Sequence, residues 1–198
     1  MKQLLTAVFI LVAVNMATGQ VQFGATAGIG GATQSDFGDI CNNDDLLTGF
    51  NAGIIIRKPF SEKFALKTNL LYALKGRSYD VLENGEYTEH KDKFNYLTLP
   101  VKAEYSIPVS KNRLYVAAGP YAGFLLDANQ KIENTKTGLN GTKNFDFGLA
   151  FELGFGKKCL SDNELQFSVS YDMGLTKIAD YDEDLRNKAL AFNIGFLF

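Results

Sequence analysis

The sequence contains no tryptophan, one histidine, two cysteines and four prolines, and its charges are nearly balanced. A net charge of −2 offers no basic surface of the kind that binds nucleic acid, so we expect no nucleic-acid partner. The few prolines, with 19 glycines, 9 tyrosines and 16 phenylalanines, favour β-structure over disorder. After the N-terminal leader, no apolar run approaches the ~20 residues of a membrane-spanning helix, so any membrane insertion must use strands.

The N-terminal leader, MKQLLTAVFILVAVNMATG, has the pattern of a secretory signal peptide. Lys2 precedes an apolar run, and small residues stand just before Gln20. We predict cleavage after Gly19, which leaves a signal peptide, 1–19, and one domain, 20–198. The alternative is an N-terminal membrane anchor, but the apolar run is shorter than a spanning helix requires.

Eight stretches of the remaining chain alternate large apolar residues with small or polar ones. This period of two is typical of a strand with two different faces. In one of them Leu165, Phe167 and Val169 alternate with Gln166 and Ser168. The predicted strands cover residues 21–30, 50–57, 64–75, 97–105, 114–126, 145–156, 165–175 and 189–198. An even number of antiparallel strands can close into a barrel.

The connections between these strands alternate in length. Long connections lie around 33–46, 77–93, 127–143 and 177–188, and short ones at 58–63, 107–112 and 158–163. Short periplasmic turns and longer outer loops are typical of an up-and-down barrel in an outer membrane. The Asn84-Gly85 pair predicts a type I′ turn, so we expect that hairpin to continue above the membrane.

Alternation alone also fits a soluble carrier barrel with an apolar interior. The membrane barrel is favoured because one face is rich in Gly, Ala and Ser, which suit a narrow lumen, while Phe, Leu, Ile and Tyr on the other suit acyl chains. The strand lengths also match a tilted membrane span. We predict an all-β, eight-stranded antiparallel up-and-down transmembrane β-barrel in the bacterial outer membrane, surrounded by lipid.

Eight charged residues fall on the face rich in small residues, with both signs equally represented. They are Arg57, Lys67, Lys75, Lys102, Glu104, Asp146, Glu152 and Asp172. Because charges removed from bulk water need partners, we predict an ionic network across a closed lumen. The alternative is a proton or ion path.

The chain ends on AFNIGFLF, with Phe192, Ile194, Phe196 and Phe198 on one face. We expect this strand to close the barrel against the first one, so that no free edge faces lipid. A terminal aromatic residue also resembles the signal that the barrel-assembly machinery recognises. We therefore expect that machinery as a partner during insertion.

Several segments resemble the PorT-like group of outer-membrane β-barrel proteins, relatives of the small OmpA/OmpX-type barrels. They are YLTLPVKAEY at 96–105, AAGPYAGFLLDA at 117–128, FDFGLAFELGFG at 145–156, YDMGLTKI at 171–178 and the final strand. The resemblance implies the fold and a location in the Gram-negative envelope. Most members have no assigned activity, and the namesake's role in a secretion and gliding apparatus is not transferred.

His90 is the only histidine and therefore the only base for a barrel hydrolase. Ser78 and Glu89 are near in sequence but form no known motif with it, so we expect a solvated loop histidine. The acidic segments 35–45 and 180–184 lack EF-hand spacing and are expected to be solvated, with Ca²⁺ or lipopolysaccharide phosphates as alternatives.

The two cysteines, Cys41 and Cys159, fall at opposite ends of the predicted barrel. Linked cysteines have Cα atoms within ~7 Å, so we predict no disulfide between them.

Together these features predict a non-catalytic membrane barrel without a cofactor. It would act as an envelope scaffold, an adhesin or a binding platform, with a surface or envelope protein as a possible partner. Three alternatives remain open at this point: a lipid-modifying enzyme with His90 at the outer rim, an accessory component of a secretion apparatus, and the soluble carrier.

Overall fold

The computed structural model describes residues 20–34, 46–83, 85–132, 135–139, 141–159, 163–178 and 185–198. Their elements are β1 (Gln22–Gln34), β2 (Leu47–Pro59), β3 (Phe64–Glu83), β4 (Glu86–Val109), β5 (Asn112–Ile132), β6 (Thr135–Gly138), β7 (Phe145–Lys158), β8 (Glu164–Gly174) and β9 (Asn187–Leu197). In these ranges no helix is long and apolar enough to cross a membrane. The signal peptide predicted at 1–19 lies outside them and stays a prediction.

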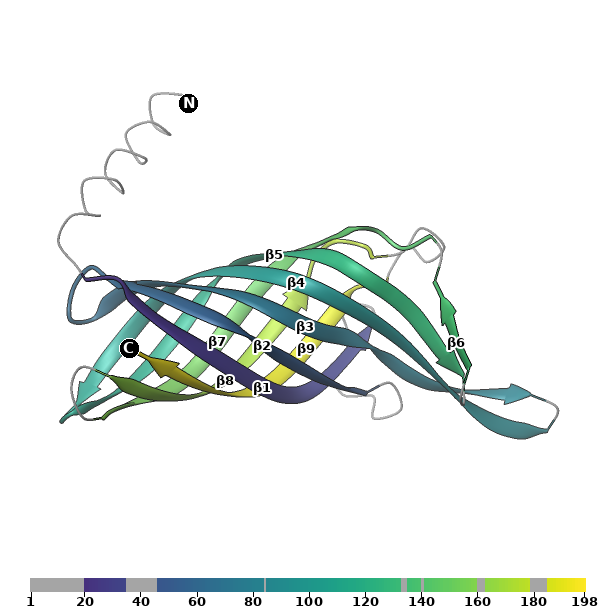
Figure 1. The fold of residues 1–198 in the computed structure, drawn as a ribbon, viewed down its shortest axis with the longest axis horizontal. Coiled ribbons are helices and arrows are strands. Elements are labelled where there is room, and N and C mark those ends of the chain that lie inside the picture. The colour runs from purple at the N-terminus through teal and green to yellow at the C-terminus, as the bar shows by residue number, and fades with distance from the viewer. Residues whose placement is uncertain are drawn as a thin grey trace, which may run out of the picture.

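All strands except β6 form a closed antiparallel ring in the order β4-β3-β2-β1-β9-β8-β7-β5, which the pairing of β5 with β4 completes (Figure 1). The pairing of β1 with β9 joins the two ends of the described chain. The amide of Phe198 donates to the carbonyl of Phe23 over 2.8 Å and extends this seam. The predicted eight-stranded up-and-down barrel is confirmed.

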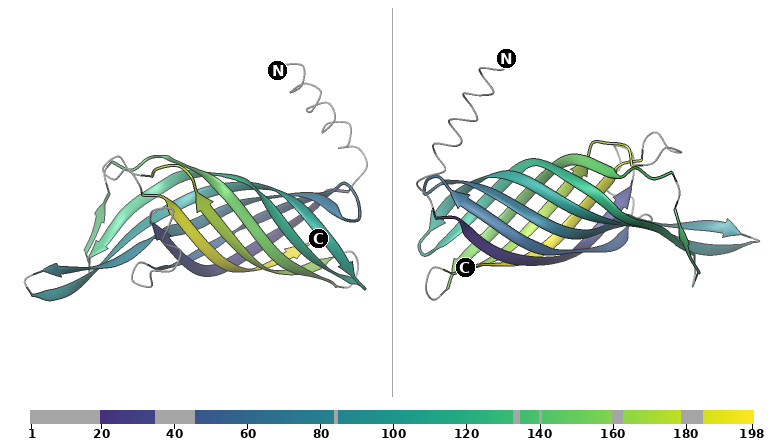
Figure 2. Two further views of the ribbon diagram at one scale, coloured as in Figure 1. Left: turned by 180° about the vertical axis from the view of Figure 1, so that it is seen from behind. Right: turned by 45° about the horizontal axis from the view of Figure 1, so that its top comes forward.

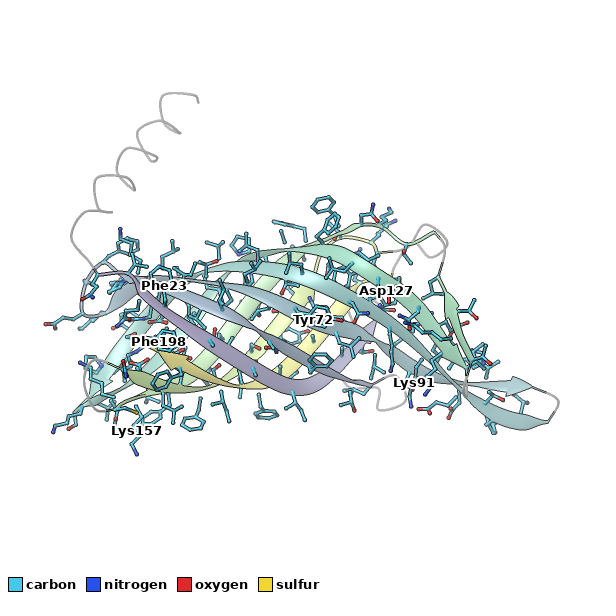
Figure 3. The ribbon with its side chains drawn as sticks, viewed as in Figure 1. Phe23, Tyr72, Lys91, Asp127, Lys157 and Phe198 are labelled. Atoms are coloured by element: carbon cyan, nitrogen blue, oxygen red, sulfur yellow. The ribbon has the colours of Figure 1, made fainter. Side chains whose placement is uncertain are left out.

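The large apolar side chains point away from the barrel axis, and the small and polar ones point into it. Phe147 and Phe167 are 48% and 44% exposed, whereas Asp146 and Ala150 are buried. Figure 3 shows side chains projecting outward along the upper and lower outlines of the barrel. This is the reverse of a soluble carrier, and it matches the prediction that the apolar face contacts lipid.

Short turns and long connections lie at opposite ends of the ring, as predicted. In Figure 3 Lys157 marks the short-turn end, where the C-terminus also lies, and Lys91 marks the other end. There β3 and β4 continue as a hairpin far beyond the other strands (Figure 2). Gly85 at its turn has φ 90°, a left-handed conformation that favours glycine. Asn84 lies outside the described residues, so the turn type stays a prediction.

One long connection differs from the prediction. Residues 127–143 were expected to form a loop, but β5 continues to Ile132 and pairs with β6, from Asn129 opposite Gly138 to Ile132 opposite Thr135. The hydrophobic pattern could not reveal this hairpin, because beyond the ring neither face of the sheet meets lipid or lumen. Its polar residues form strands without an apolar period.

Candidate functional site

At the short-turn end of the lumen, two arginines bind two glutamates. Nε of Arg57 (β2) lies 2.8 Å from Oε1 of Glu104 (β4), and Nη1 of Arg113 (β5) lies 2.5 Å from the same oxygen. Arg113 also holds both oxygens of Glu164 (β8), at 2.9 and 2.8 Å. This bidentate geometry is the strong form of an arginine–carboxylate pair, and it ties four strands together across the lumen.

In the middle of the lumen, Glu152 of β7 gathers three donors. Lys67 lies 2.7 Å from its Oε1, the hydroxyl of Tyr115 donates to Oε1 over 2.9 Å, and Lys102 pairs with Oε2. Lys67 also donates to Oε1 of Gln166 over 2.9 Å. Two ammonium groups thus share one carboxylate, and Lys67 finds neutral acceptors in Tyr115 and Gln166.

In the half of the lumen nearer the long connections, Lys75 lies between two aspartates. Its Nζ is 3.5 Å from Oδ2 of Asp146 and 3.2 Å from Oδ2 of Asp172, and it lies 4.2 Å from the ring centroid of Tyr121. The Tyr121 hydroxyl and the Asn187 amide both donate to Asp146, over 3.1 and 2.9 Å. Here two carboxylates share one cation, which reverses the ratio found around Glu152.

The structure therefore gathers all eight predicted lumen residues into three clusters. Seven of them are buried and Asp172 is half-buried. The prediction missed Arg113 and Glu164, each one position before a predicted strand. Both continue the two-residue period of the lumen face, so extending the strands by one residue would have found them. Tyr115 and Tyr121 continue the same period and lie on the same face, but a tyrosine on this face does not by itself indicate that its hydroxyl joins a charge network.

A cavity of about 60 Å³ remains beside these clusters. Its wall combines uncharged polar residues, such as Thr26, Asn51 and Asn69, with apolar ones, such as Ile55 and Leu71. A space of this size is large enough for a few water molecules. Around it the charged side chains of the lumen pair with one another across the barrel.

Beyond the ring, polar contacts fix the base of the β3–β4 hairpin. Nε of Arg77 lies 3.2 Å from Oδ2 of Asp92, and the Arg77 guanidinium lies 4.7 Å from the ring centroid of Tyr79. Gln130 donates to Asp92 and to the Tyr79 hydroxyl, over 3.1 and 2.9 Å. These contacts join β3, β4 and β5, so the sheet continues past the membrane-spanning part.

Residues 14–180 match the family described as outer membrane protein beta-barrel domain. The chain belongs to this family. It is an integral protein of the bacterial outer membrane. None of the curated proteins matches the sequence.

This outer-membrane barrel is similar to several solved structures. Neisserial surface protein A is 14% identical, with a TM-score of 0.53, over 90% of this chain and 99% of that chain. The attachment invasion locus protein Ail of Yersinia pestis is 14% identical, with a TM-score of 0.46, over 90% and 99%. OprG of Pseudomonas aeruginosa is 14% identical, with a TM-score of 0.47, over 88% and 94%. Because the sequence identity is only 14%, the similarity to neisserial surface protein A supports the fold alone. The narrower resemblance to the PorT-like group stays a prediction.

In an outer-membrane barrel short turns face the periplasm and long connections face outward. The β3–β4 hairpin and β6 therefore lie on the outer side. On this hairpin Lys91 and Ser78 hydrogen-bond to Glu89, over 2.7 and 2.9 Å, and these bonds lower the pKa of the Glu89 carboxyl. Burial raises the pKa of the Tyr79 hydroxyl.

The prediction of a solvated loop histidine was wrong. His90 is buried in β4, and its ring centroid lies 5.5 Å from that of Tyr79, its cross-strand neighbour. The extended hairpin explains the difference, because β5 covers its base. Ser78 bonds instead to Glu89, and successive residues of a strand face opposite sides. His90 thus points away from the face that carries Ser78 and Glu89.

Other candidates fall partly outside the described residues. Cys159 is an exposed free thiol just after β7, but Cys41 is not among the described residues. The acidic segments 35–45 and 180–184 are also outside them. In the part of the chain that the structure describes, no three His, Cys, Asp or Glu side chains are placed to hold a metal ion.

The four predicted assembly-signal residues lie on the outer face of β9 and just beyond it. Phe192, Ile194 and Phe198 are exposed and Phe196 is half-buried. The rings of Phe196 and Phe198 meet edge to face, with centroids 5.5 Å apart. These side chains point away from the lumen and stay available for lipid or for another protein.

Proposed function

We propose that this outer-membrane barrel is a non-catalytic binding platform, anchored by a closed barrel and presenting its outer sheet to partners. The observation that carries the proposal is the extension of β3, β4, β5 and β6 beyond the ring, held by Arg77, Asp92 and Gln130. A sheet fixed to the barrel wall presents side chains at defined positions. Binding to such a surface costs less ordering entropy than binding to a loose loop.

Support for a closed lumen comes from the three charge clusters. A path for ions needs a continuous wet route, whereas here Arg57, Glu104, Lys67, Glu152 and Lys75 pair with partners across the barrel. Eight-stranded barrels have interiors barely wide enough for their own side chains. We expect no steady conductance from the protein in planar lipid bilayers.

The lipid-modifying alternative depends on His90, because it is the only histidine. Its ring lies 5.5 Å from that of Tyr79, while Ser78 and Glu89 bond to each other on the opposite face. We therefore expect His90→Ala to leave envelope lipids unchanged. A role as an accessory component of a secretion apparatus would use the same outer surface, and a pull-down from detergent-solubilised outer membrane would identify that apparatus.

The platform is tested by cysteine labelling of intact cells in a Cys41→Ser/Cys159→Ser background. A membrane-impermeant maleimide is expected to label Tyr87→Cys on the hairpin of intact cells. The matched control, Lys111→Cys in the β4–β5 turn, is expected to react only after the outer membrane is permeabilised. Labelling of Lys111→Cys but not of Tyr87→Cys on intact cells would contradict the proposal, as would stable conductance by the wild-type protein.

A further inference from the structure

The outer part of β3 has an edge that no described strand covers. Pairing of β2 with β3 ends where Asn51 meets Ala73, yet β3 continues to Glu83. Among the described residues, 77–83 have a strand partner on one side only, which is β4. Such an edge leaves backbone N–H and C=O groups available, and an extended peptide can add to it as a further strand.

Beside this edge the hairpin exposes a pair of apolar side chains. Leu82 is 59% exposed and Tyr87 is 77% exposed, and they lie directly opposite each other in the strand register. Because the hairpin extends beyond the membrane-spanning part, these side chains face water and not acyl chains. A partner that covers them would gain hydrophobic stabilisation at the tip.

The same hairpin concentrates negative charge. Between Ser78 and His90 the chain has four acidic residues, Asp80, Glu83, Glu86 and Glu89, and no lysine or arginine. The register places Asp80 opposite Glu89 and Glu83 opposite Glu86. Like charges directly opposite each other, here Asp80 and Glu89, destabilise an antiparallel pair, and Lys91 at 2.7 Å from Glu89 offsets part of this repulsion. A cationic partner would relieve it.

This charge also selects among possible occupants of the edge. Edge-to-edge pairing of two copies would bring two acidic hairpins together, and the repulsion disfavours it. A strand with positive charge is attracted instead. Because side chains of a strand alternate between two faces, Asp80 and Leu82, two positions apart, lie on the same face of β3. A segment that pairs with this edge therefore needs a cationic residue and an apolar residue that are also two positions apart.

We propose that the outer edge of β3, over residues 77–83, docks an extended segment of another protein in which lysine or arginine and an apolar residue alternate along one face. The proposal rests on the proposed function, since it names the partner chemistry of the same outer sheet. The docked segment becomes a further strand beside β3, with its cations beside Asp80 and its apolar side chains beside Leu82. Glu89 and Tyr87 lie one strand further away, on β4, and extend the same acidic and apolar surface.

The test uses the full-length protein purified in detergent micelles and a fluorescent peptide with two repeats of lysine-threonine-valine-threonine. We expect saturable binding by fluorescence anisotropy and slower amide hydrogen exchange in residues 77–83. Asp80→Asn/Glu89→Gln is expected to weaken binding about tenfold, because it removes the carboxylate beside the cations and its cross-strand neighbour on the same face. Both changes lie on the exposed hairpin outside the ring, so this variant is expected to keep the barrel fold, which circular dichroism checks.

Two controls separate strand pairing from general attraction. Glu62→Gln/Asp127→Asn removes the same charge at exposed positions away from the outer edge of β3 and is expected to leave binding unchanged. A peptide with glutamate in place of lysine is expected not to bind. Absence of binding to the wild-type protein, an equal loss in both double variants, or binding without protection of 77–83 would each overturn the proposal. None of these results depends on the labelling of intact cells, so the two proposals fail separately.

Discussion

At the scale of single residues, the middle of the lumen depends on Glu152. Its two oxygens accept from Lys67, Lys102 and Tyr115, and both lysines are buried. Burying an ammonium group costs several kcal/mol unless a carboxylate and further hydrogen bonds compensate for its lost hydration. One carboxylate supplies that compensation for two cations.

Replacing Glu152 by glutamine is therefore expected to destabilise the barrel strongly. The change keeps the size of the side chain but leaves two buried ammonium groups without their counter-charge, a loss of roughly 3–5 kcal/mol. The measurement is urea unfolding in lipid vesicles, followed by circular dichroism. Glu89→Gln makes the same change on the exposed hairpin and is expected to shift stability by less than about 1 kcal/mol. Equal losses of stability in the two variants would contradict the role of Glu152 as the counter-charge of Lys67 and Lys102.

Glu89 gives a pH-dependent prediction outside the membrane. Its hydrogen bonds from Lys91 and Ser78 lower the pKa of its carboxyl, so they favour the ionised form in the folded hairpin. The stabilisation is thus present above the unfolded-state pKa of about 4.3 and is lost as pH falls through the lower folded value. Titration of the labelled carboxyl carbon by NMR is expected to show the lowered pKa, and Lys91→Ala is expected to raise it. A pKa unaffected by that change would exclude Lys91 as the cause.

At the scale of elements, β5 and β7 pack closely because tyrosine rings of β5 lie over glycines of β7. The Tyr115 ring on β5 covers the position where a Cβ on Gly154 of β7 would stand, and Tyr121 similarly covers Gly148. The absence of these Cβ atoms lets the tyrosines lie flat against the lumen wall and reach Glu152 and Asp146. Glycine placement thus positions the hydroxyls of the charge network.

Gly154→Ala is expected to destabilise the barrel by about 1–3 kcal/mol, because the new methyl group overlaps the buried Tyr115 ring. Gly138→Ala in β6 is the matched control, since nothing lies within 4 Å of the added Cβ. Both are measured by the urea unfolding assay described for Glu152→Gln. If Tyr115 could move aside freely, the two variants would unfold at the same urea concentration.

At the scale of the whole molecule, the seam between β1 and β9 closes the barrel and places Phe198 at its end. Its ring is 64% exposed on the lipid side, so it adds little to packing inside the protein. The proposed assembly signal is consistent with this position, because a recognition element must stay accessible to another protein.

Phe198→Ser is expected to lower the amount of protein in the outer-membrane fraction several-fold, measured by immunoblot, while the purified protein keeps its stability. Phe145→Ser is the matched control, because Phe145 is 65% exposed on the same lipid-facing surface but lies far from the C-terminus. If both variants reach the outer membrane equally well, recognition by the barrel-assembly machinery does not depend on the Phe198 ring.

Much of the barrel could be predicted from local patterns, and part of the outer sheet could not. The spanning strands were predictable because lipid on one side and a narrow lumen on the other impose a strict two-residue period, as in Phe145 to Glu152. The polar hairpin of β5 and β6 was missed because water meets both of its faces. The buried position of His90 was missed because it depends on β5, which pairs with this part of β4 only in the folded molecule.

The sequence by itself determined the number, faces and order of the eight strands that close the ring, because alternation and connection length are properties of the chain. Only the tertiary structure decided which charges meet. Lys67 and Glu152, or Arg113 and Glu164, are far apart in sequence, and their contacts depend on how the strands are staggered around the ring. No local pattern specifies that stagger, because it results from closing the whole barrel.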